Sequence, residues 1–299
     1  MDLTAYLKAH YTPQTQNAYK REIERFISTV ENAETSRHKD IVGYIGVLRE
    51  KGYTSATLKR ILASIKAYFD YLVYIKKRKD NPSKSVYLKD KQNRSIQLQD
   101  LFTPEELESL MERKNRYYLL GSRNKVLTSL LIYQALLPNE LTNLEVENIN
   151  LEKAKIYIKG SSKTNARELP LKPKQILLFY EYIHHIRPKL LEKSQSQSQS
   201  TENKLLITHK GNPESVDSLI SHFKSYKNHF TDQTGKPDSR KLNMRTIRQS
   251  VITNLLSAGN DLRMVQVFAG HKYPSATENY KQTNVEELKK QVLKYHPLG

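Results

Sequence analysis

Apolar side chains recur every three or four residues through the first part of the chain, which is the spacing of an amphipathic helix. Thr12 followed by Pro13 is typical of a helix start, Gly52 of a helix end, and Ser55 of the cap of a further helix. The apolar stripes predict three helices, over residues 13–30, 39–51 and 55–72. About the first ninety residues are therefore expected to be all helical.

The pattern then breaks. Residues 76–92 hold seven Lys or Arg and two Asp around a proline, without periodicity, which indicates a linker. Such a charge run is either a solvated tether or a segment that lies along a phosphate backbone. Helical signals resume at Thr103, where Pro104 and two glutamates suit a first turn. We place a helical domain at residues 1–85, a linker at 86–100 and a second domain at 101–299.

The second domain is expected to be helical with a small β component. "KAKIYIKG" and "ARELPL" predict two strands around the turn "GSSKTN", and "LLITHKG" predicts another strand. "SQSQSQST", residues 194–201, is a low-complexity surface loop. Helices are expected through "RNKVLTSLLIYQALL", over residues 173–186, and from about residue 212 to the end. The fold class is therefore mainly α.

The composition of the chain indicates which class of molecule it binds. Forty-nine Lys and Arg against 31 Asp and Glu leave a net charge of +18, which favours a polyanion and above all nucleic acid. A basic surface for solubility, or a ribosome-associated protein, is the alternative. No apolar run approaches membrane-spanning length and no signal peptide is apparent, so we expect a cytoplasmic protein without membrane contact. The absence of cysteine excludes disulfides and thiol catalysis, and His184, His185 and His209 lack carboxylates at metal-ligand spacing.

Polar residues of one stretch carry the candidate chemistry. Residues 244–282 read "MRTIRQSVITNLLSAGNDLRMVQVFAGHKYPSATENYKQ", with Arg245, Arg248, His271 and Tyr280 in that order. With the hairpin and the order of elements, this resembles the tyrosine recombinase family of phage integrases and Xer-type resolvases. The resemblance implies a SAM-like core-binding domain, an α/β catalytic domain, and DNA cleavage without metal or cofactor.

The resemblance also assigns roles. Tyr280 is the expected nucleophile, which stores bond energy in a 3′-phosphotyrosine. Arg248 is the expected phosphate clamp and His271 the donor to a non-bridging oxygen. Lys159 is the expected general acid for the 5′-hydroxyl leaving group, with Lys163 in the turn as its competitor.

Two positions depart from the family pattern. The motif "HxxR" begins here with Arg245, and "TGLRxxEL" reads "QALLPNEL", which places Leu137 at the first arginine. Losing one charge-assisted donor costs on the order of 10² to 10³ in rate, by analogy with oxyanion holes. Three accounts stay open: Arg245 supplies the charge; another basic residue does so, such as Arg123 or one from a neighbouring protomer; or the chain binds DNA without chemistry.

The expected function is site-specific recombination, which cuts and rejoins a double-stranded DNA target. The alternative is a catalytically silent DNA-binding accessory protein. Residues 284–295, "NVEELKKQVLKY", predict a helix that couples protomers in a homotetramer, or one that docks on its own domain. A bacterial, nucleoid-associated location follows from this reading. Candidate DNA contacts are the basic residues of the third helix and of the linker, namely Lys59, Arg60, Lys66, Lys76, Lys77 and Arg78.

Overall fold

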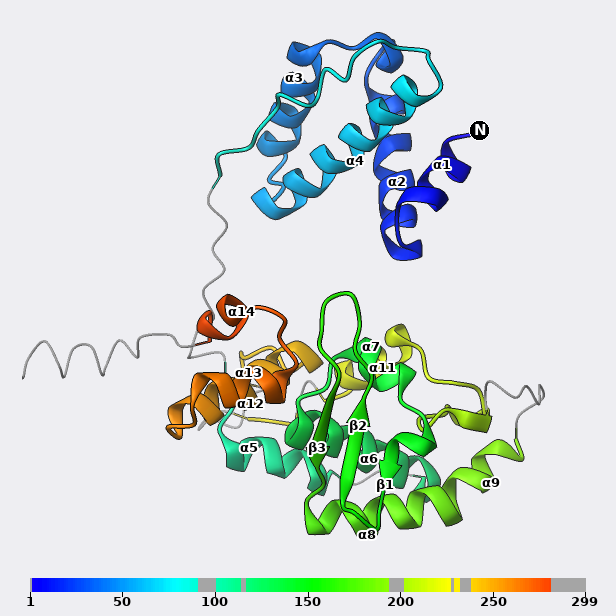
Figure 1. Cartoon of the computed structure of the whole chain (residues 1–299), viewed down its shortest axis with the longest axis vertical. Helices are drawn as coiled ribbons and strands as arrows, with labels where there is room; N and C mark the ends of the chain where they lie inside the picture. The colour runs from blue at the N-terminus through cyan, green and yellow to red at the C-terminus, as the bar shows by residue number, and fades with distance from the viewer. Residues whose placement is uncertain are drawn as a thin grey trace, which may run out of the picture. The chain divides into compact units, whose positions relative to one another are not determined.

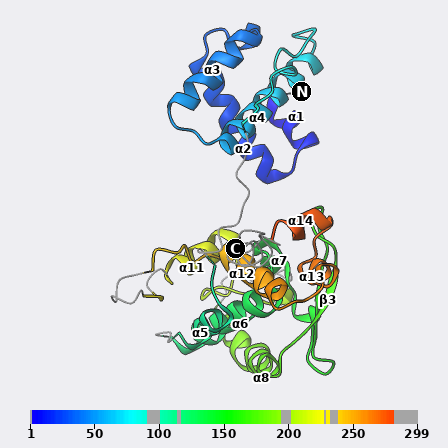
Figure 2. The same cartoon turned by 90° about the vertical axis from the view of Figure 1, so that its left-hand side faces the viewer.

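The computed structural model describes residues 2–90, 101–113, 117–193, 202–226, 229–231 and 238–280. The chain divides into two units, Met1–Arg94 and Ser95–Gly299, each with its own hydrophobic core (Figures 1 and 2). The expected low-complexity loop, the expected C-terminal helix and most of the expected linker lie outside the described residues. None of the described helices is long and apolar enough to cross a membrane.

The N-terminal unit is helical, as predicted. Thr54, not Ser55, caps the fourth helix, because its hydroxyl accepts a bond from the backbone N–H of Thr57 at 3.3 Å. The short first helix was not expected from the sequence. The other three α-helices confirm the three helices that the apolar spacing predicted. The elements are α1 (Leu3–His10), α2 (Pro13–Thr29), η1 (Ala33–Thr35), α3 (His38–Glu50) and α4 (Ser55–Tyr74).

The core of this unit forms where α2 crosses α4. Phe26 of α2 is fully buried and meets Phe69 of α4 edge-on, with ring centroids 6.1 Å apart. Beside them Glu22 is buried at 1% exposure and accepts a bond from Arg60 of α4 at 3.0 Å. After α4 the chain returns along the unit, and Val86 enters the same core. Part of the stretch with the charge run therefore packs against the helices.

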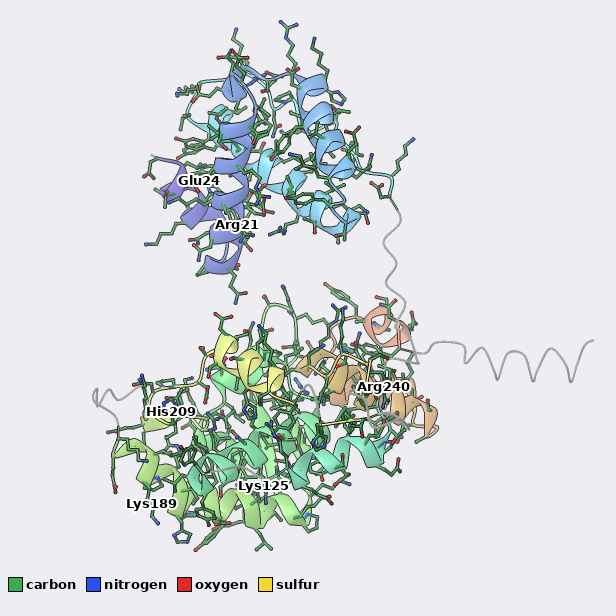
Figure 3. All side chains as sticks on the ribbon, turned by 180° about the vertical axis from the view of Figure 1, so that it is seen from behind. Arg21, Glu24, Lys125, Lys189, His209 and Arg240 are labelled. Atoms are coloured by element: carbon green, nitrogen blue, oxygen red, sulfur yellow. The ribbon has the colours of Figure 1, made fainter. Side chains whose placement is uncertain are left out.

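The second unit begins at a well-formed helix start. Thr103 accepts from the backbone N–H of Glu106, and the Glu106 side chain accepts from the backbone N–H of Thr103. Arg240, labelled in Figure 3, binds the Glu106 carboxylate and lies 4.5 Å above the Phe102 ring. These contacts tie the start of the unit to the segment that precedes α12. The helices up to the sheet are α5 (Pro104–Ser109), η3 (Leu110–Glu112), α6 (Tyr118–Gln134), α7 (Pro138–Asn143) and η4 (Val146–Asn148).

Helix α6 is the centre of this unit. Most of its residues are buried, and α8, α9 and α12 pack against it (Figure 1). The predicted helix over residues 173–186 exists, but a π-helical turn interrupts it and it continues further. The remaining helical elements are α8 (Pro173–Glu181), η5 (Tyr182–Ile186), α9 (Arg187–Leu191), α11 (Val216–Lys224), α12 (Met244–Ser257), α13 (Leu262–Ala269) and α14 (Pro274–Glu278).

A three-stranded antiparallel sheet covers one side of this unit, in the order β1-β2-β3. The two predicted strands are confirmed, and a short first strand adds to them. The predicted strand at residues 205–211 is wrong: Leu205, Leu206 and Ile207 are buried, but this segment forms only isolated bridges. Burial in a helical core explains the apolar run that suggested a strand. The strands are β1 (Ile149–Asn150), β2 (Lys155–Ile158) and β3 (Arg167–Pro170).

Candidate active site

Arg248 lies at the junction of three helices. It belongs to α12, is 5% exposed, and donates to the carbonyl of Ala135 at the end of α6 and, at 2.7 Å, to that of Ala269 at the end of α13. Burial lowers its pKa, while the charge of Glu140 opposes that shift. The guanidinium is thus a buried cation whose position the backbone fixes.

His271 follows the positive-φ Gly270 that ends α13. Its Nε2 lies 3.2 Å from Nη2 of Arg248, and its Nδ1 lies 2.8 Å from the hydroxyl of Thr277. Burial, together with the charges of Arg248 and Arg167, lowers the pKa of His271 to about 4. The ring is therefore neutral at pH 7. Because a guanidinium only donates, Nε2 is the acceptor and Nδ1 carries the proton.

Tyr280 stacks on His271. The two rings are 5.8 Å apart between centroids and 17° from parallel. The ring is partly buried against Ile252, Val265 and Ala269, and its hydroxyl interacts with Arg248. The structure thus brings together three of the predicted residues, Arg248, His271 and Tyr280, within one chain.

The β2–β3 hairpin loop joins this cluster through its backbone. Thr164 pairs with His271, and the N–H of Asn165 donates to the carbonyl of Gly270 at 2.9 Å. Lys159 and Lys163 are both exposed on this loop. Lys163 directly precedes the residue that pairs with His271, so the loop carries both candidate acids beside the site.

The two departures from the family pattern have different surroundings. Leu137 is the N-cap residue of α7 and is partly buried, so an apolar side chain stands where the first arginine was expected. Arg245 is exposed in the first turn of α12, and no side-chain bond of it is found in the described part of the chain. Arg123 is buried and paired with Glu214, in a cluster that also includes Asn124.

One ion pair at the site was not anticipated from the sequence. Arg167, the first residue of β3, donates to both oxygens of Glu140 in α7, at 2.7 and 3.0 Å. Burial alone would raise the pKa of Glu140, but the bonds and charge of Arg167 lower it overall. The available signal was the glutamate of "PNEL", which stands at the glutamate of the family pattern, and the arginine of "ARELPL", which the sequence placed in a strand.

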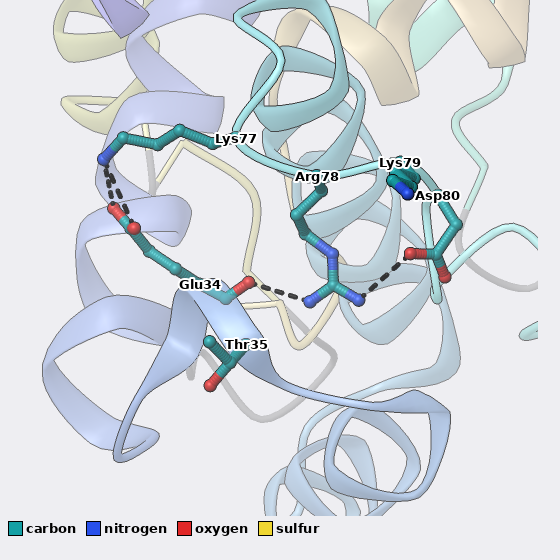
Figure 4. A pocket seen from close by; sticks show the side chains of 6 residues that line it. All are labelled: Glu34, Thr35, Lys77, Arg78, Lys79 and Asp80. Atoms are coloured by element: carbon teal, nitrogen blue, oxygen red, sulfur yellow. Dashed lines mark hydrogen bonds and ion pairs between the residues drawn. The ribbon is translucent and has the colours of Figure 1, made fainter.

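The candidate DNA-contact residues of the N-terminal unit have partners inside that unit. Lys59 donates to the carbonyl of Asp90 at 2.9 Å and Lys66 to that of Lys84 at 3.3 Å. A surface pocket of about 410 Å³ lies at the start of the charge run of residues 76–92, where Lys77 pairs with Glu34 (Figure 4). The same pocket holds Arg78, which binds backbone carbonyls of Glu34 and Ser36, whereas Lys76 is exposed with a φ of 60°.

Known proteins share both units. Residues 100–287 match the model of the Phage integrase family, and residues 2–76 match the Phage integrase N-terminal SAM-like domain. Two curated relatives are the tyrosine recombinase XerC of Natranaerobius thermophilus, 26% identical over 99% of this chain and 98% of its own length, and the tyrosine recombinase XerD of Staphylococcus saprophyticus, 26% identical over 97% and 95%.

Solved structures show the same fold. The Tn1549 transposon integrase in complex with a circular intermediate DNA is 16% identical, with a TM-score of 0.69 over 97% of this chain and 99% of that one. The XerH recombinase bound to its difH substrate is 19% identical, with a TM-score of 0.66 over 93% and 78%. Fold and family model together define a tyrosine recombinase. The chain belongs to the Phage integrase family, and the expected fold class is confirmed.

We predict that Gly270→Ala damages the site. A Cβ on Gly270 would lie 2.5 Å from Nη1 of Arg167, and the backbone has a φ of +68°. The left-handed backbone costs about 1–2 kcal/mol, and overpacking adds about 1–3 kcal/mol. Urea unfolding should show both losses. Gly259→Ala is the matched control, because its φ is +83° but nothing lies within 4 Å; equal losses in both variants would contradict the close approach of Arg167.

We predict an acid-sensitive fold. Burial and neighbouring arginines lower the pKa of both His271 and His222 to about 4, from the ordinary 6.5. Between these values the unfolded chain binds more protons, so this stability is fully present above pH 6.5 and is lost as pH falls through 4. The difference in urea midpoint between pH 7 and pH 5 should shrink in His222→Asn and in His271→Gln. An unchanged difference in both variants would refute the burial effect.

Proposed function

We propose that this chain is a site-specific DNA recombinase that cuts and rejoins double-stranded DNA through a phosphotyrosine on Tyr280. The observation that supports this most is the stack of Tyr280 on His271, with Arg248 bonded to the same imidazole. A phenol, a neutral base and a buried cation are the groups that attack on a phosphodiester needs. Membership in the Phage integrase family and the tyrosine recombinases among its relatives support the same reaction.

The first step is attack of the Tyr280 oxygen on phosphorus. A phenol is mostly protonated at pH 7 and needs a base. Nε2 of His271 accepts a bond from Arg248 in the structure, so it takes the phenol proton once a bound phosphate oxygen has taken over that N–H. Burial lowers the pKa of this histidine to about 4 and keeps the imidazole neutral. Once protonated, the imidazolium donates to a non-bridging oxygen, so both roles follow from one ring. Arg248 stabilises the charge that develops on the other oxygens.

The second part of the step is departure of the 5′-oxygen. A lysine ammonium protonates it, and we assign this role to Lys159, with Lys163 as the alternative on the same loop. The DNA is expected to contact the exposed cations of both units. The proposed homotetramer depends on residues 284–295, which lie outside the described residues, and the proposed setting is the bacterial nucleoid.

The test of this proposal is a covalent adduct. With nicked duplexes drawn from a random-sequence library, the wild-type chain should form a DNA adduct that survives denaturation, and Tyr280→Phe should form none while it still binds DNA. Tyr273→Phe is the matched control, because this tyrosine is 71% exposed in the same segment. Binding without any wild-type adduct would instead support an accessory DNA-binding protein.

The general acid can be identified by changing the leaving group that it protonates. Lys159→Ala should slow cleavage by about 10² to 10⁴. A 5′-bridging sulfur, whose thiolate leaves without a proton, should restore the rate. Lys163→Ala should behave as wild type on both substrates; the reverse result would transfer the role to Lys163. Arg248→Ala is the control that sulfur should not rescue, because its charge acts on non-bridging oxygens.

A further inference from the structure

The site needs a second cation, and neither Arg245 nor Arg123 is bonded to Arg248, His271 or Tyr280 in the described part of the chain. Arg245 is exposed in the first turn of α12, where its side chain makes no bond within the described residues. Arg123 is buried and bonded to Glu214 and Asn124. Its charge is therefore already compensated in a separate cluster. Leu137 itself is apolar, so the charge must come from another element.

Arg167 of β3 is connected to the Leu137 position through the carboxylate of Glu140. Its side chain is 2% exposed and holds Glu140 by two bonds. The same carboxylate accepts a bond from the backbone N–H of Leu137 at 2.8 Å. The guanidinium is thus linked through one carboxylate to the residue at the expected arginine position.

The same guanidinium faces the rest of the site. Its Nη1 packs against Gly270, where a Cβ would lie only 2.5 Å away. Its charge acts on both Arg248 and His271, since it contributes to the lowered pKa of each after the larger effect of burial. Its Nε is buried and has no hydrogen-bond partner in the described part of the structure. A buried donor without a partner is unusual in a folded protein.

The ion pair between Arg167 and Glu140 sets the net charge around Arg248. Glu140 is close enough to Arg248 to influence its pKa. Without Arg167, this carboxylate would cancel the charge of Arg248 and repel a phosphate. With Arg167 present, two guanidiniums and one carboxylate leave a net charge of +1. The pair therefore lets Arg248 act as a full cation.

We propose that Arg167 makes up for the positive charge missing at Leu137, as a positioning residue that offsets Glu140 beside Arg248 at the scissile phosphate. This rests on the proposed recombinase function. It explains how the site can retain activity with leucine at the first arginine position. It also explains why Gly270 has no side chain, since a Cβ would displace this guanidinium.

The test measures coupling between Arg167 and a phosphate charge without requiring cleavage. In a Tyr280→Phe background, binding is compared on library-selected duplexes that carry one neutral methylphosphonate at successive positions. Removing the phosphate charge that the site holds should weaken binding of the Glu140→Gln chain by about tenfold or more, the size of a charge-assisted hydrogen bond. The Glu140→Gln/Arg167→Gln chain should show a much smaller loss at that position.

The variants are chosen so that folding does not decide the outcome. Replacing both partners of the ion pair avoids a buried unpaired carboxylate. Arg123→Gln/Glu214→Gln is the matched control, because it removes another buried ion pair and should keep the full methylphosphonate effect. Equal methylphosphonate effects with and without Arg167 would overturn the proposal.

A chemical measurement separates this proposal from the proposed function. With Tyr280 present, Glu140→Gln/Arg167→Gln should form adduct about 10² times more slowly than Glu140→Gln. Adding Leu137→Arg to the Glu140→Gln/Arg167→Gln chain should restore at least part of the lost rate of adduct formation. No gain in rate would mean that Arg167 has only a structural role. No adduct from the wild-type chain would refute the recombinase function, while the binding comparison would still decide whether Arg167 acts on a phosphate.

Discussion

Arg248 brings a permanent positive charge into a buried place, and the carbonyls of Ala135 and Ala269 hold it there. A cation removed from water is tolerated only where polar groups replace its hydration. The ends of α6 and α13 must therefore meet at α12 with their free carbonyls facing inward. His271 and Tyr280 follow α13 directly, so their positions depend on the same contact. The candidate site is in this sense a consequence of how one guanidinium is solvated by the backbone.

The charge around that guanidinium comes from elements far apart in sequence. Glu140 enters from α7 and Arg167 from the hairpin, and they form a pair buried from solvent. A buried pair of this kind adds little stability by itself, since desolvation offsets most of the attraction. Its value here is electrostatic, because it decides how much of the Arg248 charge a phosphate can use. Loss of an arginine at one position is thus compatible with a cationic site.

Basic side chains of the N-terminal unit are also bonded to groups of their own unit. Lys59, Lys66 and Arg78 donate to backbone carbonyls of their own unit, and Arg60 bonds the buried Glu22. The bonds to carbonyls leave the charges of Lys59 and Lys66 in place, because a carbonyl does not neutralise a cation, whereas Glu22 offsets the charge of Arg60. The net charge of +18 can still attract a polyanion over long distance. DNA contacts through these side chains would compete with the internal bonds.

Local patterns in the sequence determined the helices α2, α3 and α4 and the hairpin strands, and the resemblance to a known family made Arg248, His271 and Tyr280 candidates. Periodicity, caps and turn residues act between neighbours, so they can be interpreted without a fold. These patterns wrongly predicted a strand at residues 205–211, and they did not predict the ion pair between Arg167 and Glu140. Burial and pairing between distant segments leave no periodic trace in a single sequence. Only the tertiary structure decided which cations surround Arg248, because that depends on three helix ends and one hairpin meeting in space.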